Sequence, residues 1–116
     1  MPDMNWSNTE KKLARHLFEL ALQRKFAALM TEFRTRAAQA SEPEDLWNIE
    51  RFLRDARREI DERFDYRYSR LIVLFGCLLG EGLIEEQELA GLAAGKIAEI
   101  RHIASFRQKS CTPVAD

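Results

Sequence analysis

Residues 8 to 39 form a long segment without glycine or proline, and its apolar residues recur at helical spacing. Ser7 and Glu10 stand at its start as a capping box, the pair of side chains that satisfies free N–H groups at the beginning of a helix. Most helices have only about 11 or 12 residues. The segment therefore predicts an elongated helix that at least one other helix must cover.

A second helix is expected to begin after a very short connection. Ser41 and Glu44 repeat the capping-box pattern, and Pro43 falls in the first turn, where proline is tolerated. The apolar stripe of this helix consists of Leu46, Ile49, Leu53, Ala56 and Ile60. Because the connection is short, the two helices should pack as an antiparallel hairpin over about residues 8–64.

The apolar run at residues 71–80 predicts the most buried helix of the chain. It is too short to cross a membrane, which needs about 20 residues. Asp65 is a candidate cap for this helix, and glycines at positions 80 and 82 mark its end. A fourth helix is expected over about residues 85–106.

Glycine and proline are scarce, with five and three residues, whereas helix-favouring residues fill most positions. We therefore predict an all-α fold with one domain over residues 1–107. It consists of the long antiparallel hairpin and a smaller helical head at about residues 66–106. Residues 108–116 are expected to form a disordered tail.

A hairpin of two long helices has little depth of core, so its apolar stripe needs a further layer. The fourth helix cannot cover the whole hairpin and also pack against the third, and a two-fold homodimer would supply the layer. The expected dimer interface contains Leu46, Ile49, Leu53 and Ile60. A compact monomeric four-helix bundle is the alternative.

Charge and motifs exclude several function classes. The formal net charge of −1 disfavours a nucleic-acid binder, although a turn at Gly82 would be compatible with a helical nucleic-acid regulator. The sequence has no phosphate-binding glycine loop and no nucleophile motif, so neither an enzyme nor a cofactor is expected. Glu99 and His102 have the spacing of a ferritin-like iron ligand pair, but His102 falls opposite the apolar stripe, and no metal site is predicted.

The two cysteines, Cys77 and Cys111, are far apart in the sequence and have no partners at metal-ligand spacing. Neither a disulfide framework nor a zinc site is therefore indicated, and reduced thiols are expected. The chain also shows no basic-then-apolar leader. These features predict a cytoplasmic protein that does not insert into a membrane.

The second helix carries a candidate binding surface. Trp47 lies on the same flank as Arg51, Arg54 and Arg58, and tryptophan and arginine are enriched at binding hot spots. The alternative is a solvated face, because Glu50 and Arg54 are one of several oppositely charged pairs spaced i, i+4. A stack of Trp47 on Arg51 within the chain would also be structural.

Several short motifs over about residues 6–106 resemble the cyanobacterial fluorescence recovery protein family. The matching residues are Trp6-Ser7, Asp45-Leu46-Trp47, Phe52-Leu53, Arg57, Glu59-Ile60-Asp61, Phe64-Asp65, Arg67, Ser69, Glu81-Gly82-Leu83 and Glu88-Leu89. The block in the middle of the chain is the most specific part of this resemblance.

The resemblance implies an all-helical homodimer that is not an enzyme. Members bind the photoactivated orange carotenoid protein, chiefly through its C-terminal domain, and speed its return to the resting form, which ends quenching of phycobilisome excitation. A relative of that C-terminal domain is another expected partner. A different protein client, served as a scaffold or chaperone, is the alternative.

The resemblance also implies a contact patch on the second helix. Trp47 and Arg57 match it, whereas Glu50 and Arg51 stand where the family has histidine and aspartate. Arginine in place of an acid reverses the charge at the centre of the patch. With Arg54 from the same flank, these five residues are the expected partner-binding set, and Leu46 matches the family position that packs across the dimer.

Overall fold

The computed structural model describes residues 5–106, and these residues form helices joined by short connections. The elements are α1 (Asn8–Gln39), α2 (Pro43–Arg63), α3 (Tyr68–Glu81), the short 3-10 helix η1 (Glu86–Leu89) and α4 (Ala94–Ala104). The prediction of an all-α fold is confirmed. The tail expected at residues 108–116 lies outside the described residues.

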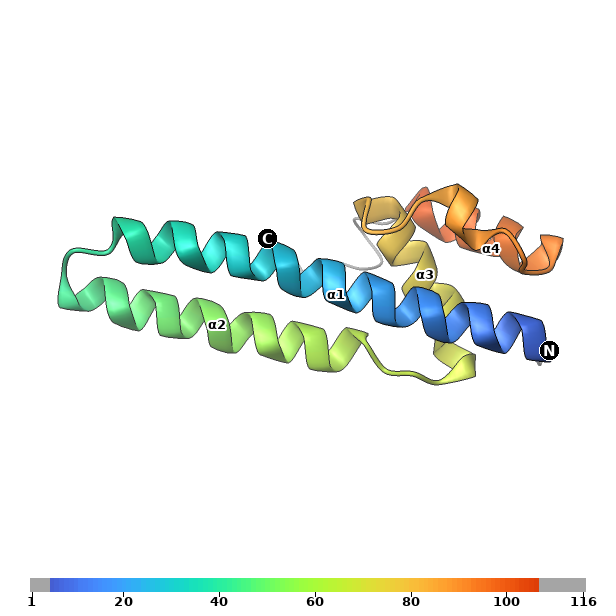
Figure 1. Ribbon diagram of the computed structural model, residues 1–116, viewed down its shortest axis with the longest axis horizontal. Coiled ribbons are helices and arrows are strands. Elements are labelled where there is room, and N and C mark those ends of the chain that lie inside the picture. Colours follow the sequence, from blue (N-terminus) through green and yellow to red (C-terminus); the bar gives the residue numbers. More distant parts are fainter. Residues whose placement is uncertain (1–4, 107–116) are drawn as a thin grey trace.

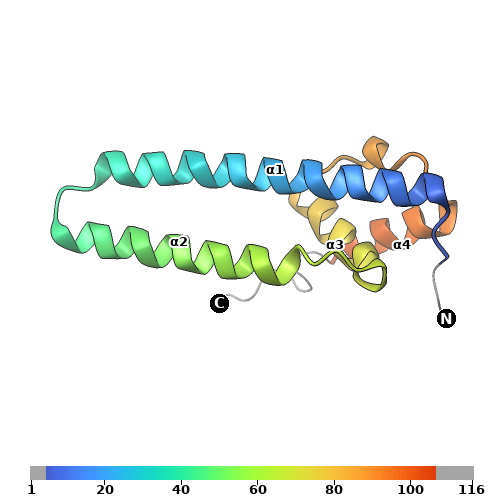
Figure 2. The same cartoon turned by 60° about the horizontal axis from the view of Figure 1, so that its bottom comes forward.

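The long helix α1 runs the whole length of the molecule, and α2 lies antiparallel beside its C-terminal half (Figures 1 and 2). The principal extents of 53 × 27 × 21 Å show an elongated shape. The radius of gyration is 16.4 Å, whereas a compact chain of this length would have about 13 Å. The structure is thus the predicted hairpin with a head and not a compact four-helix bundle.

Local capping explains where the hairpin helices begin. At α1, the Ser7 Oγ accepts a hydrogen bond from the Glu10 N–H at 3.1 Å, and Glu10 Oε1 accepts one from the Ser7 N–H at 3.0 Å, as predicted. At α2 the predicted cap is wrong by one residue, because Glu42 is the N-cap. The Asp45 carboxylate accepts from the N–H groups of Ser41 and Glu42 at 2.9 and 3.0 Å.

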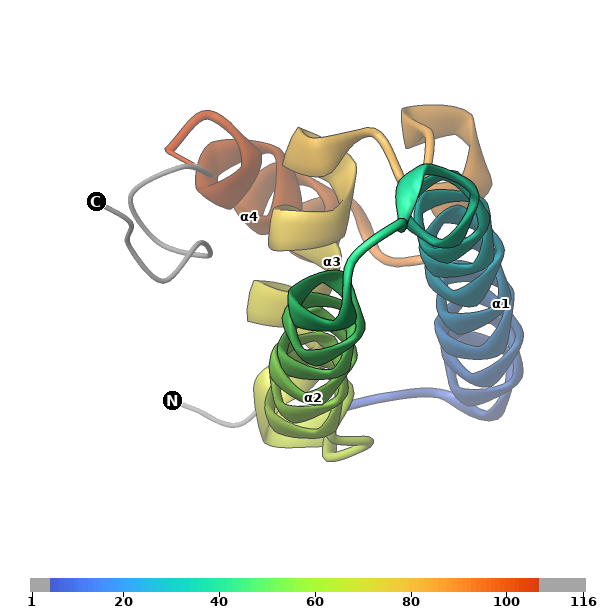
Figure 3. The same cartoon turned by 90° about the vertical axis from the view of Figure 1, so that its left-hand side faces the viewer.

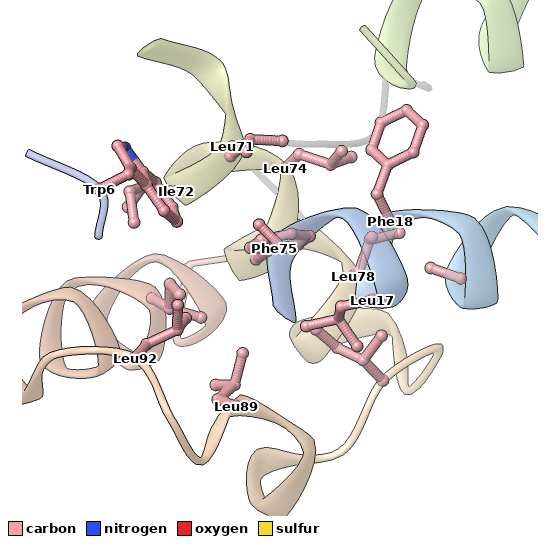
Figure 4. Packing of buried hydrophobic residues seen from close by; sticks show 14 residues of the cluster. Trp6, Leu17, Phe18, Leu71, Ile72, Leu74, Phe75, Leu78, Leu89 and Leu92 are labelled. Carbon is pink, nitrogen blue, oxygen red and sulfur yellow. The ribbon is translucent and has the colours of Figure 1, made fainter. Parts of the chain in front are cut away.

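Most of the hydrophobic core lies in the head, at the end of the molecule that holds the first half of α1. Figure 4 shows side chains of α1, α3 and the segment from η1 to Leu92 converging, with Phe75 among them. Phe75, Leu17 and Leu71 are essentially inaccessible to solvent. Helix α4 packs closely on α3, since a Cβ atom at Gly76 would lie 2.5 Å from the Ile103 side chain.

The connections inside the head differ from the sequence prediction. Asp65 does not cap α3, whose N-cap is Arg67 without a side-chain hydrogen bond. Gly82 ends α3 in the left-handed region at φ 84°, as expected. The single helix expected over residues 85–106 is wrong, because η1 and a turn at Gly91 with φ 115° precede α4.

The head packs on one side of the α1–α2 pair (Figure 3). Ion pairs fix it to the hairpin: Arg24 of α1 donates to both Glu88 carboxylate oxygens at 2.9 and 2.8 Å and to the Leu83 carbonyl at 2.7 Å. Arg63 of α2 joins Glu59 and Glu81 at 2.9 and 2.8 Å. These contacts hold the first half of α1 in the head and leave its second half to α2.

Cys77 is buried in α3 and is disulfide-bonded, so the expectation of a reduced thiol at this position is wrong. Cys111 lies outside the described residues.

Between residues 5 and 106, none of the helices has both the length and the apolar character that a bilayer span requires.

Candidate functional site

The hairpin exposes large apolar side chains where the head does not cover it. Phe26 and Met30 of α1 and Leu46 and Leu53 of α2 are all exposed, Leu46 at 57% of its surface. We call these four residues the apolar face. Exposure of several large apolar side chains in one region is typical of a surface that another molecule covers.

Helix geometry places all four residues on one side of the hairpin. At about 100° per residue, Phe26 and Met30 project roughly opposite to Ala14 and Ala21, which are buried in the head core. On each helix the exposed apolar residues lie next to the positions that contact the other helix. Because α1 and α2 are antiparallel, helical spacing places these neighbouring positions on the same side of the hairpin.

The other two residues expected at a dimer interface are turned further toward α1. Ile60 is only 6% exposed and is buried within its own chain. Ile49 is half-buried and lines a shallow pocket with Arg36 and Gln39 of α1. The predicted stripe of α2 therefore divides into an inner edge that packs on α1 and an outer edge, Leu46 and Leu53, that stays open.

Trp47 extends this open surface around the outer side of α2. Its side chain is 63% exposed, the highest value among the large exposed apolar residues. Arg51, Arg54 and Arg57 are also exposed, and helical spacing places them around the same flank. The structure thus brings the sequence-predicted binding residues onto one solvent-accessible flank, next to the apolar face.

Charge pairing on this flank is uneven. Arg54 holds Glu50 through two hydrogen bonds of 2.7 and 3.2 Å, and this contact lowers the pKa of the Glu50 carboxyl below its ordinary value. Arg57 lies 3.9 Å from Asp61 with its side chain 86% exposed. Arg51 donates only a long bond of 3.4 Å to Asn48. Glu50 is therefore engaged within the chain, while Arg51 and Arg57 are open to a partner.

The alternative of an Arg51–Trp47 stack is not among the cation–π contacts of residues 5–106. On the hairpin, Arg36 of α1 instead lies over the Phe52 ring of α2, 4.1 Å from its centroid. This contact joins the C-terminal part of α1 to the middle of α2. The Trp47 ring stays exposed to solvent.

Phe26 and Met30 are the surface residues that sequence reasoning missed. The apolar pattern of α1 continues to about residue 37 although its buried residues end at Ala21. This part of α1 has more apolar positions than one covering helix can bury, and that excess is the sequence signal for an exposed apolar surface. It indicates a second contact partner for the C-terminal half of α1.

The described residues offer little for metal chemistry. No group of three or more His, Cys, Asp or Glu side chains converges within residues 5–106. His102 is exposed and makes an edge contact with Phe106 at 5.1 Å. What the arrangement can do chemically is bind another surface, through apolar contacts flanked by an indole and guanidinium groups.

Fold and surface together define a class of small all-helical proteins in which a long hairpin carries a head at one end. A family described as photoprotection regulator fluorescence recovery protein matches residues 6–104. The chain belongs to the fluorescence recovery protein family.

Individual relatives agree with this assignment. The fluorescence recovery protein of Synechocystis sp. is 39% identical over 99 residues, covering 85% of this chain and 91% of the relative. Its solved structure superimposes with a TM-score of 0.83, and that of Fremyella diplosiphon, 37% identical, with 0.82. Each alignment covers 87% of this chain and 99% of the solved chain.

Proposed function

We propose that this chain is a cytoplasmic, homodimeric regulator that binds the photoactivated orange carotenoid protein through its C-terminal domain and speeds its return to the resting state. The observation that carries the proposal is the apolar face with Trp47 beside it, on a chain of the fluorescence recovery protein family. The return of that protein to its resting state would end the quenching of phycobilisome excitation.

The apolar face supports the proposed dimer. The hairpin buries Ile60 against α1 but leaves Phe26, Met30, Leu46 and Leu53 in water. A second copy related by a two-fold axis would place the same face against itself, which is the simplest way to remove it from water. The indole of Trp47, which lies further round α2, would stay accessible in such a dimer.

The regulatory step rests on differential affinity. A protein that binds the transition state for domain closure more tightly than the open form lowers the barrier to closure. Such a partner acts without covalent chemistry. Trp47 would supply contact area, and Arg57 would supply an exposed charge with directional hydrogen bonds.

A second candidate is a different protein client, and the state of Glu50 favours it. The Glu50 carboxylate is held by Arg54, and Arg51 places a positive charge where the family resemblance implies an acid. A partner shaped for an acidic patch would meet a guanidinium there. A charge mismatch at an interface costs several kcal/mol in unfavourable cases.

The recovery rate of photoactivated orange carotenoid protein in the dark tests the proposal. Adding this chain should accelerate recovery, and Trp47→Ala should reduce the acceleration by about tenfold, as for loss of a hot-spot aromatic. Because Trp47 is mostly exposed, the thermal melting temperature of the variant should stay close to that of the unchanged chain.

Two controls decide between the candidates. Glu50→His combined with Arg51→Asp should increase the acceleration if the substituted patch weakens binding to this partner. If neither the unchanged chain nor the double variant accelerates recovery, this result contradicts the orange carotenoid protein as the partner. A different protein client would then be the remaining candidate.

A further inference from the structure

A second polar surface lies in the head half of the molecule, away from the Trp47 flank. An open groove of about 440 Å³ runs between the first half of α1 and the α2–α3 connection. We call it the basic groove; it is lined by Lys11, Lys12, Arg15, His16, Glu19, Tyr66 and Tyr68. None of these residues belongs to the apolar face or to the Trp47 flank.

Two tyrosines form the aromatic wall of the basic groove, and other rings hold them from behind. The centroids of Tyr66 and Tyr68 are 5.6 Å apart. Phe18 packs edge-on against Tyr66 at 5.0 Å, and Trp6 packs against Tyr68 at 5.6 Å. Since Phe18 and Trp6 are buried in the core cluster, the tyrosine rings are fixed before any ligand arrives.

Cations stand along the α1 side of the groove. The Arg15 guanidinium lies 4.2 Å from the Tyr66 centroid, and the Lys11 ammonium lies 5.6 Å from that of Tyr68. Arg15 has one loose ion pair, 3.8 Å to Glu19, with both side chains more than half exposed. Among the described residues, Lys11 and Lys12 have no ion pair. The lining thus holds three full positive charges against one negative charge.

The tyrosine hydroxyl groups add hydrogen-bond donors. Burial, with a contact to Tyr68, raises the pKa of Tyr66 to about 12, so its phenol stays protonated at neutral pH. The Tyr66 hydroxyl donates a long bond of 3.5 Å to the Lys11 carbonyl. Fixed tyrosines beside an arginine have the composition of protein-binding surfaces, where aromatic rings provide contact area at low entropic cost.

We infer that the basic groove binds an extended acidic segment of a partner protein. Lys11 and Arg15 are one helical turn apart, about 6 Å along the α1 axis. In an extended peptide, side chains two residues apart point the same way and are separated by about 6.7 Å. Alternate acidic residues of an extended segment would therefore meet successive cations, while the intervening residues contact the tyrosine rings.

Nucleic acid fits this groove less well. Glu19 lies within the lining and would repel a phosphate backbone. The whole chain carries a formal net charge of −1, so no long-range positive field supports binding of a polyanion. A short segment with separated carboxylates can place a neutral residue beside Glu19, which a continuous phosphate backbone cannot do.

Binding of labelled peptides to the full chain tests this inference, independently of any orange carotenoid protein. The probe is a fluorescein-labelled peptide that alternates glutamate with alanine, measured by fluorescence anisotropy at low salt. A peptide with glutamine in place of glutamate and a single-stranded oligonucleotide serve as comparison probes. The glutamate peptide should bind, and the other two should bind at least about tenfold more weakly, a difference of about 1.4 kcal/mol.

Charge reversal at one position locates the binding. Lys12→Glu should weaken binding of the glutamate peptide about tenfold, and the fold should survive because Lys12 is exposed and unpaired among the described residues. Arg34→Glu is the matched control, an exposed residue of α1 about 33 Å further along the helix. Equal weakening by both variants, or tighter binding of the oligonucleotide, would overturn the inference.

Discussion

At the scale of single residues, Glu10 does more than cap α1, because its side chain also bonds to other parts of the head. Beyond its bond to the Ser7 N–H, its carboxylate accepts from the Ala93 N–H at 2.7 Å and from the Lys96 ammonium at 3.1 and 3.3 Å. Lys96 also donates to the Asn5 carbonyl at 2.7 Å. One buried carboxylate therefore fixes the start of α1 and the start of α4 together.

Glu10→Gln should destabilise the chain at neutral pH, because it leaves the buried Lys96 without its counter-charge. The loss is expected to be about 3 kcal/mol, the low end for breaking a buried ion pair. Unfolding by urea, followed by circular dichroism at pH 7, measures it. The glutamine amide has a single acceptor oxygen, whereas the Ser7 N–H bonds to Oε1 and the Ala93 N–H to Oε2, so the loss includes one backbone hydrogen bond as well as the charge.

The same residue predicts a pH dependence. A hydrogen bond from the Ser7 N–H lowers the pKa of the Glu10 carboxyl below its ordinary value of 4.5. Burial raises this pKa in part, and the contacts with Ala93 and Lys96 lower it again. A lowered pKa means that this stabilisation is present above 4.5 and is lost as pH falls through the folded value. The difference between Glu10→Gln and the unchanged chain should therefore shrink as the pH falls below 4.5. A difference that stays constant with pH would contradict the role of the charge.

At the scale of elements, the end of α3 depends on one backbone conformation. Gly82 adopts φ 84° after the last turn, and the N–H of Leu83 bonds back to the Leu78 carbonyl at 3.0 Å. A side chain at this position is strained in the left-handed region even though nothing crowds it. The turn that directs the chain from α3 into η1 thus requires glycine.

Gly82→Ala should lower the free energy of unfolding by about 1 kcal/mol. Gly95→Ala is the control, because Gly95 lies inside α4 with open space around it, and alanine favours the helix. Thermal melts should show a lower midpoint for the first variant and an equal or higher midpoint for the second. Equal destabilisation by both would contradict the role of the left-handed turn.

Features set by neighbouring residues could be predicted from the sequence, and features set by distant contacts could not. The Ser7–Glu10 cap and the left-handed Gly82 depend on local geometry. By contrast, α4 begins at Ala94 because the Ala93 N–H reaches Glu10, 83 positions away, and the periodic pattern of residues 85–106 contains no trace of that bond.

The candidate site shows the same division. The apolar stripe of α2 was visible in the spacing of Leu46, Ile49, Leu53 and Ile60. Which edge of the stripe α1 covers depends on the rotation of α2 within the hairpin, and so Ile60 is buried while Leu46 is open. The basic groove was also missed, because its tyrosines come from the α2–α3 connection and the start of α3, and its cations come from α1.

At the scale of the whole molecule, the two halves of the chain differ in how they are stabilised. The head buries residues from α1, α3, η1 and α4, whereas α2 buries only Ile60. The hairpin beyond the head is held by single contacts such as Arg36 on Phe52 and by a thin apolar contact. A second copy on the apolar face would supply the missing layer.

The mass of the chain in solution tests this proposed layer most directly. Size-exclusion chromatography with light scattering should give about 27 kDa, twice the 13.5 kDa of one chain. Leu46→Glu, which places a charge in the apolar face, should give about 13.5 kDa, whereas Val73→Glu on the exposed side of α3 should remain dimeric. A mass of one chain for the unchanged protein, or an unaltered dimer for Leu46→Glu, would contradict the apolar face as the dimer interface.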